Sequence, residues 1–256
     1  GREKTTEGIV GFLNKVCEVE LEPYIESSYQ ELADYVNAYD QKMIMKRENI
    51  ADRAIWTAKK RYILNVWDSE GVRYEQAKLK IMGIEAIKTS TPAPCRTMLK
   101  DAFKLLMTGT EDEVIDYIAD CRSSFKKLPP EEVGFPRSVN NLQKYKGTSD
   151  IYNKGTPINV RGALLFNHYI KTKNLEHKYS AIQNGEKIRF CYLKTPNWMH
   201  ENVISYIQDL PKELDLHKHV DYDLQFEKAF LDPIKVILNC IGWETERKNT
   251  LDSFFS

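Results

Sequence analysis

Apolar residues between positions 9 and 36 recur at steps of three and four residues, which is the spacing of one face of an α-helix. The positions are Ile9, Leu13, Val16, Leu21, Tyr24, Ile25, Leu32 and Val36. Pro23 lies inside this stretch, and proline is tolerated in the first turn of a helix but not in its interior. The pattern therefore predicts two consecutive helices over residues 9–39, the second beginning near Pro23.

Alternation of apolar and polar side chains, typical of β-strands, follows in three short segments. They are Lys42–Lys46, Tyr62–Trp67 and Leu79–Met82. The turn-forming residues Asp68-Ser69-Glu70-Gly71 connect the last two segments. We therefore expect residues 1–88 to form a small antiparallel sheet with helices covering one of its faces.

The pattern changes at Thr89–Pro94, where two prolines break any regular element and indicate a boundary. The elements predicted beyond it are a helix ending at Gly109, a helix opened by the capping box Thr110–Glu113, a helix from Arg161, a hairpin turn at Asn184-Gly185, and a long or kinked helix over Tyr222–Ile241 that restarts at Asp232-Pro233. The fold class that follows is α+β, with a small antiparallel sheet and helices over residues 1–88 and a mainly helical region over residues 89–249.

The composition is that of a globular protein, because 42% of the 256 residues are hydrophobic and 29% are charged. No run of about 18 apolar residues is available to cross a membrane, and the first residues contain no apolar signal core. Five scattered cysteines without a Cys-x-x-Cys spacing fit reduced thiols better than disulfides or a zinc site. We therefore expect a cytoplasmic protein. Gly1 in place of methionine indicates processing or a piece of a longer chain.

The net charge is zero, but the charges are unevenly distributed. Residues 134–161 carry five cations and one acid, whereas residues 201–232 carry eight acids and three lysines. Since Lys and Arg neutralise phosphates, the first segment is a candidate nucleic-acid surface. His217 and His219 lack a carboxylate-rich surrounding, so a surface pair is expected there rather than a metal site.

Three consecutive cations, Lys59, Lys60 and Arg61, open the predicted strand that continues through Tyr62. Residue types alone leave two interpretations open. The charges can simply end a strand and keep it soluble, because charged residues usually face solvent. Alternatively, side chains that reach about 6 Å from the backbone can grip a phosphate or enter a DNA groove.

The wider sequence favours the second interpretation. Lys59-Lys60-Arg61-Tyr62, followed by Asn65-Val66-Trp67-Asp68 and by Lys78–Gly83, strongly resembles the late palm segment of B-family DNA polymerases, above all those of T-even-type bacteriophages. Further similar segments are Ser90-Thr91-Pro92, Asn140-Asn141 with Lys144-Tyr145, Val160-Arg161-Gly162, Gly185-Glu186-Lys187 and Phe226–Ile234. The resemblance therefore covers nearly the whole chain. One departure is the connection over residues 50–57, which is shorter and less Gly-rich than the family's.

The resemblance implies that residues 1–88 are the C-terminal part of a polymerase palm and residues 89–249 a thumb. It implies that Lys59, Lys60, Arg61 and Tyr62 lie at the minor groove and primer strand. Every base pair presents acceptors at similar minor-groove positions, so a lysine donor there checks pair geometry without reading sequence. The resemblance also suggests four contacts to the DNA backbone, for which a solvated surface position is an equally open alternative. These are Lys88, Asn141, Lys144 and Arg161.

The last residues, 250–256, carry Leu251, Phe254 and Phe255. Adjacent aromatics at a chain end can fold back into a core. The resemblance implies instead that they dock in a hydrophobic pocket of a sliding clamp, where a short apolar motif on a flexible leash acts through local concentration.

Phosphoryl transfer needs two Mg²⁺ ions bridged by carboxylates. The family's two carboxylate motifs for these ions are absent, and Asp221-Tyr222-Asp223 lies where a helix cap is expected. We therefore expect no catalytic residue, metal site or cofactor in this chain, and Mg²⁺ only in the complete polymerase.

The leading hypothesis is the C-terminal portion of a phage-type replicative DNA polymerase, either a fragment or the smaller product of a split gene. Its expected partners are primer–template DNA, the N-terminal part of the polymerase and a sliding clamp. We expect it to act in the cytoplasm of an infected bacterium and not to associate with a membrane. The alternative is a stand-alone DNA- and clamp-binding accessory protein without catalytic activity. A third possibility is an unrelated helical adaptor.

Overall fold

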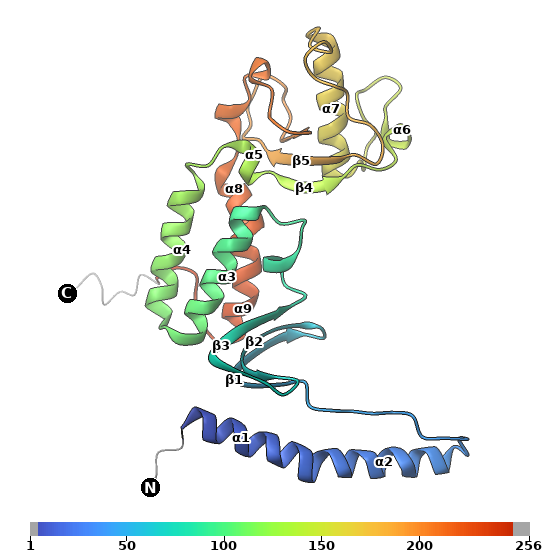
Figure 1. The fold of residues 1–256 in the computed structure, drawn as a ribbon. Helices are drawn as coiled ribbons and strands as arrows, with labels where there is room; N and C mark the ends of the chain where they lie inside the picture. The colour runs from blue at the N-terminus through green and yellow to red at the C-terminus, as the bar shows by residue number, and fades with distance from the viewer. Residues whose placement is uncertain (1–4, 248–256) are drawn as a thin grey trace, which may run out of the picture. The chain divides into compact units, whose positions relative to one another are not determined.

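The computed structural model describes residues 5–247 and has the predicted α+β fold, with two three-stranded antiparallel sheets and their helices (Figure 1). These residues form two compact units. The first contains residues 5–56 and 62–81, and the second contains residues 57–61 and 82–247. Within this part of the chain, no helix combines the length and the apolar character needed to cross a lipid bilayer.

The first unit begins with a continuous helical stretch. It consists of α1 (Thr6–Val16), a π-helical turn over Cys17–Leu21 and α2 (Glu22–Tyr35). The backbone N–H of Glu22 donates to the carbonyl of Cys17, five residues earlier, which is the π-helical spacing. Pro23 lies in the first turn of α2, as predicted. The two predicted helices are therefore confirmed and are joined without a loop.

The sheet of this region has the strand order β1-β2-β3, with β1 over Asn49–Ala58, β2 over Arg61–Ser69 and β3 over Val72–Met82. The strand predicted over Lys42–Lys46 is wrong, since this segment has no regular structure. Its apolar members Met43, Ile44 and Met45 are exposed, so the alternation buries neither face. Residues 50–57, expected as a connection, are instead part of β1, where Ile50 and Ile55 are buried.

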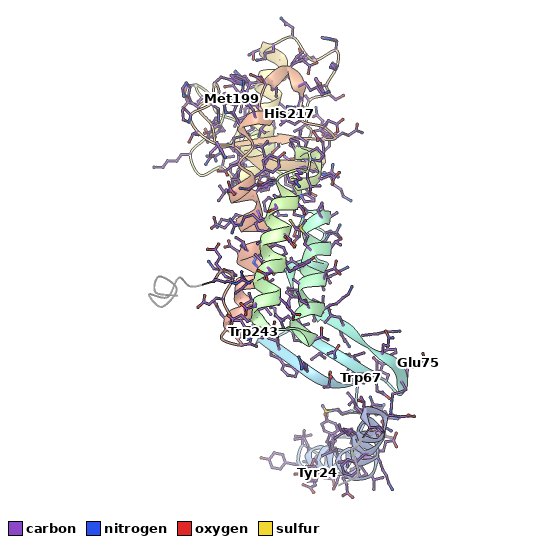
Figure 2. All side chains as sticks on the ribbon, turned by 90° about the vertical axis from the view of Figure 1, so that its left-hand side faces the viewer. Tyr24, Trp67, Glu75, Met199, His217 and Trp243 are labelled. Atoms are coloured by element: carbon purple, nitrogen blue, oxygen red, sulfur yellow. The ribbon has the colours of Figure 1, made fainter. Side chains whose placement is uncertain are left out.

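The predicted packing of the first helices over the sheet is also wrong. In the stretch from α1 to α2 only Val10 and Ala33 are buried, and Figure 2 shows Tyr24 projecting away from its helix. The side of α1 that meets the rest of the unit borders a cavity of about 510 Å³ lined by Asn14, Glu18 and other polar residues. Polar side chains occupy that side, so the apolar stripe has no core to enter.

A buried carboxylate holds the first unit together instead. Asp68 in β2 pairs with Arg47 at 2.6 Å and with Arg73 at 3.3 Å. Arg47 also donates to the Asn14 side chain of α1 at 2.6 Å. Burial opposes ionisation of Asp68, but the hydrogen bonds from Arg47, Gly71 and Arg73 outweigh it, so the pKa of Asp68 lies below its usual value.

The second unit contains a three-helix layer. Its members are α3 (Ala93–Thr108), α4 (Glu111–Phe125) and a C-terminal stretch in which α8 (Tyr222–Phe226), a π-helical turn (Glu227–Leu231) and α9 (Asp232–Asn239) follow one another. In Figure 1 the three run side by side. Phe125, Phe226 and Phe230 are fully buried in their core, and the rings of Phe125 and Phe226 lie 5.3 Å apart. The predicted capping box of α4 and the helix end at Gly109 are confirmed.

The other part of this unit is built around the second sheet. Its elements are α5 (Pro130–Val133), β4 (Phe135–Ser138), α6 (Leu142–Tyr145), α7 (Ile158–Thr172), β5 (Lys187–Tyr192) and β6 (Val203–Tyr206), and three 3₁₀ turns lie at Glu85–Ile87, Lys212–Leu214 and His217–His219. The strand order is β4-β5-β6, with Phe135 opposite Phe190. A Cβ at Gly162 would overlap with Ser205 of β6, so glycine is what lets α7 approach the sheet.

The hairpin predicted at Asn184-Gly185 is wrong, although the strand after it is confirmed as β5. The chain does turn there, but β5 pairs with β4 and with β6, and no strand precedes the turn as its hairpin partner. The turn is held by hydrogen bonds from Gly185 N–H to the Val139 carbonyl and from Val139 N–H to the Glu186 carbonyl. The dipeptide specifies a local reversal, whereas burial of Ile188 and Phe190 selects the partner strands.

The cysteines provide a test of this packing. Burial raises the pKa of Cys95 and Cys191 to about 12 and that of Cys121 to about 11, whereas Cys240 is exposed. Because the thiolate is the reactive form, we expect Ellman's reagent at pH 8 to label Cys240 in the native protein and to leave the three buried thiols unlabelled. Mass spectrometry would identify the labelled positions, with labelling in guanidinium as the control. Rapid native labelling of Cys191 would contradict the described core.

Candidate nucleic-acid interface

Lys59 and Lys60 are the two residues of the turn between β1 and β2. Both side chains are exposed, and no ion pair to either ammonium group is found within residues 5–247. Lys60 has a φ of +61°, in the left-handed region that residues other than glycine seldom adopt. The sequence suggests three cations at the start of a strand. The structure places two of them at the tip of a hairpin, where no neighbouring strand limits the reach of their side chains.

The backbone of this turn is packed against the end of β3. Gly83, which follows β3, has a φ of +67°, and a Cβ on it would overlap with the carbonyl oxygen of Lys60. Only glycine satisfies both the conformation and the close approach. The segment Lys78–Gly83 is part of the family resemblance, but the sequence alone does not explain why it ends in glycine. The close approach to Lys60 explains it.

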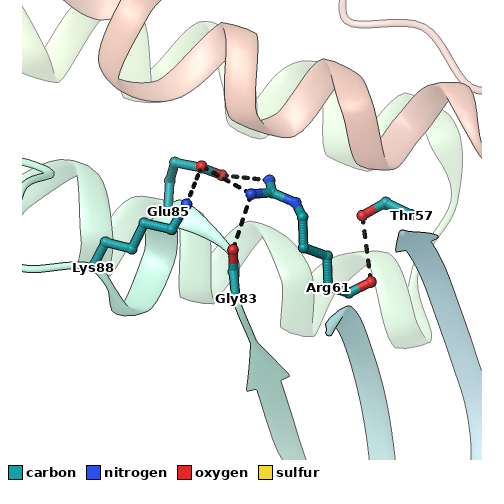
Figure 3. Close-up of polar contacts among 5 residues, drawn as sticks. All are labelled: Thr57, Arg61, Gly83, Glu85 and Lys88. Atoms are coloured by element: carbon teal, nitrogen blue, oxygen red, sulfur yellow. Dashed lines mark hydrogen bonds and ion pairs between the residues drawn. The ribbon is translucent and has the colours of Figure 1, made fainter. Parts of the chain in front are cut away.

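Arg61 fixes the same turn through its side chain (Figure 3). Its guanidinium donates to the Gly83 carbonyl at 3.0 Å and forms an ion pair with Glu85 at 2.9 Å. Lys88 pairs with the other oxygen of Glu85 at 2.8 Å, and the Thr57 hydroxyl donates to the Arg61 carbonyl at 3.4 Å. Arg61 and Lys88, both predicted to contact DNA, are thus joined by a carboxylate that no pattern in the sequence singles out.

The environment of Glu85 has a measurable electrostatic consequence. Burial by itself would raise the pKa of this carboxyl, but the hydrogen bonds from Arg61 and Lys88 outweigh burial and hold the pKa below its usual value. The carboxylate is therefore charged at neutral pH and available to both cations.

Tyr62, the next residue of β2, is half-buried. Its ring lies 6.4 Å from that of Trp56 in β1 with a tilted geometry. Trp56 is 64% exposed and was not among the predicted site residues. Its only signal in the sequence is the position of a large aromatic residue three places before the lysines.

Two of the other predicted residues lie together at the short helix α6. Asn141 adopts the left-handed conformation just before this helix, which asparagine tolerates better than most residues, and its carbonyl accepts the backbone N–H of Lys144 at 3.0 Å. Both side chains are exposed, and the Lys144 ammonium lies 5.5 Å from the centre of the Tyr145 ring.

Arg161 is in a different setting. It is half-buried in the first turn of α7, donates to the Asn202 side chain and lies 5.7 Å from the centre of the Tyr152 ring. The Tyr152 hydroxyl in turn donates to Glu201 at 2.7 Å. The guanidinium is therefore oriented by its neighbours. The structure brings Arg61 together with Lys88 and Asn141 together with Lys144, but no described contact joins these pairs to each other or to Arg161.

A basic cavity that was not predicted lies in the second unit. It measures about 280 Å³ and is lined by Thr89, Ser90, Pro136, Arg137, Ser138 and Lys187. Arg137 donates to the Ser90 carbonyl at 2.6 Å, which ties the start of this unit to β4. Hydroxyl groups and cations together suit a phosphate oxygen.

The acidic motif Asp221-Tyr222-Asp223 is a helix cap, as predicted. Asp221 accepts the N–H of Leu224 at 3.1 Å and so caps α8, while Asp223 pairs with Lys126 at 2.7 Å. Between residues 5 and 247, no three His, Cys, Asp or Glu side chains are grouped so that they could hold a metal ion. The predicted clamp-binding residues Leu251, Phe254 and Phe255 lie outside the described residues.

Two known proteins are similar to this chain over nearly its whole length. The chain is 32% identical over 259 residues to the DNA-directed DNA polymerase of Escherichia phage RB69, a match that covers 96% of the chain. It is 28% identical over 268 residues to the DNA-directed DNA polymerase of Enterobacteria phage T4, covering 99% of the chain. No family model matches. The chain spans only 28–29% of the length of these two polymerases, so the expected resemblance to part of a T-even-type phage polymerase is confirmed.

The packing of Gly83 against the turn leads to a paired test. Gly71 also has a positive φ, but a Cβ there meets no atom within 4 Å. We therefore expect Gly71→Ala to cost about 1 kcal/mol through backbone strain alone, and Gly83→Ala to cost about 2 kcal/mol more through overlap with Lys60. Urea unfolding of the two variants measures the difference. Equal losses of stability would show that the close approach does not exist in solution.

The ion pairs of Glu85 predict a pH dependence. Since the folded-state pKa of Glu85 is lowered, its contribution to stability is present above the ordinary glutamate pKa of about 4.3 and is lost as the pH falls through the lowered value. We expect Glu85→Gln to be less stable than wild type by about 1–2 kcal/mol at pH 7, and this gap to narrow below about pH 4. Urea unfolding at a series of pH values measures both effects, and a gap independent of pH would contradict the assignment.

Proposed function

We propose that this chain is the C-terminal portion of a T-even-type phage replicative DNA polymerase, a B-family enzyme, and that it holds the primer–template duplex during DNA replication. In this proposal residues 1–88 complete the palm and residues 89–249 form the thumb. Similarity to two phage polymerases along 96–99% of the chain supports it. The observation that carries it is the exposed pair Lys59 and Lys60 at the tip of a braced hairpin.

The geometry of the turn suits a contact with the minor groove. The two ammonium groups extend from a backbone that Gly83 and Arg61 hold in place, so little conformational freedom is lost when DNA binds. The purine N3 and pyrimidine O2 acceptors occupy similar positions in every base pair. Lys59 and Lys60 can therefore donate to any correctly paired primer end, with Tyr62 beside them. Arg61 acts through the turn, because its guanidinium is bound to Glu85.

The thumb contacts in this proposal go to phosphates. Asn141 and Lys144 are exposed at the α6 helix, where a backbone of fixed shape presents them on one side of the second unit. Arg161 is oriented by Tyr152 and Asn202, and Lys88 by Glu85. Contacts of this kind position a duplex without reading its sequence, which is what a replicative enzyme requires.

Nucleotidyl transfer belongs to the complete polymerase. Two Mg²⁺ ions would activate the primer hydroxyl and neutralise the triphosphate, and the carboxylates that hold them would come from the N-terminal part of the enzyme. The described acids do not fit this task, since no group of three could hold a metal ion, and Asp221 and Asp223 are engaged in a cap and an ion pair. The N-terminal part is therefore the essential partner of this chain.

The tail adds a tether. Leu251, Phe254 and Phe255 form a short apolar motif at the end of the sequence. We assign this motif to a sliding clamp, which would keep the polymerase at the primer terminus in the cytoplasm of the infected bacterium by raising its local concentration.

A double substitution tests the proposal. We expect Lys59→Ala with Lys60→Ala to weaken binding to a primer–template duplex by about 10- to 100-fold at low salt, because two charge-assisted hydrogen bonds to DNA are removed. The slope of log affinity against log salt concentration should become shallower by about one for each phosphate that the variant no longer neutralises. Fluorescence anisotropy between roughly 50 and 200 mM salt measures both quantities.

The matched control is Lys100→Ala with Lys235→Ala, which removes the same charge from exposed positions on α3 and α9 and should leave affinity and salt slope unchanged. Unaltered duplex binding by the Lys59/Lys60 variant would refute the proposed role of the turn.

A primer-extension assay tests the dependence on the N-terminal part. Primer extension should need this chain and the N-terminal part together. Extension by this chain alone would refute the proposal that the N-terminal part supplies the metal-binding carboxylates.

A further inference from the structure

The stretch from α1 to α2, residues 6–35, carries a long apolar surface that nothing in the described residues of the first unit covers. Large apolar side chains are exposed at eight positions of this stretch, Phe12 and Val19 among them. We call the other six, which follow one helical face, the arm stripe, namely Ile9, Leu13, Leu21, Tyr24, Leu32 and Tyr35. Their exposed fractions lie between 41% and 85%. Single exposed apolar residues are ordinary on protein surfaces, but six large ones on a single helical stretch form a patch of the kind that marks an interaction site.

The π-helical turn over Cys17–Leu21 keeps this stripe on one side. In α1 the apolar face follows steps of four and three residues through Ile9, Leu13 and Val16. From Leu21 on, the steps to Tyr24, Leu32 and Tyr35 are three, eight and three residues, and the step of eight equals two steps of four. Between the two helices the apolar face continues from Val16 to Leu21, a step of five residues. A π turn contains one residue more than an α turn, so it absorbs this extra residue and restores the alignment.

The charge of the arm restricts what can cover it. Residues 6–35 contain seven acids and a single cation, Lys15. The acids are Glu7, Glu18, Glu20, Glu22, Glu26, Glu31 and Asp34. DNA is repelled by such a surface, and two copies of the arm lying side by side would repel each other as well. The chemistry therefore points to a protein surface that offers an apolar groove bordered by lysine or arginine.

The lengths of the two similar polymerases indicate which protein could offer an apolar groove bordered by basic residues. The matches cover 96–99% of this chain, the arm included, but only 28–29% of each polymerase. Most of a polymerase of that type is thus supplied by sequence outside this chain.

We propose that the arm stripe is the docking surface for the N-terminal part of the polymerase. This inference rests on the proposed function and extends it by naming the residues that join the two parts. A stretch of 30 residues in helical conformation is about 45 Å long, enough for a protein–protein interface of standard size. The same surface would be covered by the remainder of the chain if the two parts are made as one polypeptide.

A triple substitution tests the docking surface. Tyr24→Gln, Leu32→Gln and Tyr35→Gln remove apolar area from the C-terminal half of the stripe and keep good helix formers at exposed positions. The probe is the purified polymerase segment encoded upstream of this sequence in the same genome. We expect the full wild-type chain to bind it and the triple variant to bind at least about 100-fold more weakly, with an unchanged circular dichroism spectrum. Amide exchange over residues 6–35 should slow only in the wild-type complex.

The control is Val236→Gln with Ile241→Gln, which removes exposed apolar side chains of the second unit and should change the affinity less than about twofold. Binding of the triple variant at wild-type strength would overturn the proposal. So would failure of the wild-type chain to bind the upstream segment, or its assembly into a dimer that the triple substitution dissociates. Duplex binding by the chain alone is measured separately. Its absence in wild type would contradict the proposed function, whereas its retention in the triple variant shows that docking and DNA binding are distinct.

Discussion

The structure of the candidate interface depends on one close approach between backbone segments. Gly83 lies so near the carbonyl of Lys60 that no side chain fits between them, and Arg61 closes the same contact by donating to Gly83 and pairing with Glu85. A turn with a left-handed lysine is strained by itself. Here hydrogen bonds and an ion pair from the end of β3 support the turn, so that two lysines project from a fixed backbone rather than from a mobile loop.

The same contacts divide the cations of the motif into two kinds. Lys59 and Lys60 have no ion-pair partner among the described residues, whereas Arg61 and Lys88 share the carboxylate of Glu85. A neutral chain thus separates its charges by position. Cations gather at the hairpin tip and at α6, and acids gather on the arm of residues 6–35. Electrostatics then favours DNA at the first two surfaces and a protein at the third, although the net charge of zero favours neither.

Local sequence signals predicted elements whose determinants are themselves local. The capping box of Thr110 and Glu113, the cap at Asp221 and the proline in the first turn of α2 all involve neighbours within four residues, and all are confirmed. Two predictions that needed a distant partner were wrong. Lys42–Lys46 alternates without a strand to pair with, and Asn184-Gly185 reverses the chain without forming a hairpin, because β5 pairs with β4 from about fifty residues earlier. An alternating pattern of apolar and polar residues shows that a strand could have one apolar face. It does not show whether another segment buries that face.

By itself the sequence determined the fold class, the longer helices and the resemblance to phage polymerases, since composition, periodicity and caps are properties of neighbouring residues. Only the tertiary structure decided what each cation does. Lys59, Lys60 and Arg61 are chemically similar and consecutive, yet Arg61 is turned toward Glu85, twenty-four residues away, while the lysines face solvent. The reason is physical. The energy of a charge depends on which oppositely charged group lies within a few ångströms, and that distance is set only when separate segments pack together.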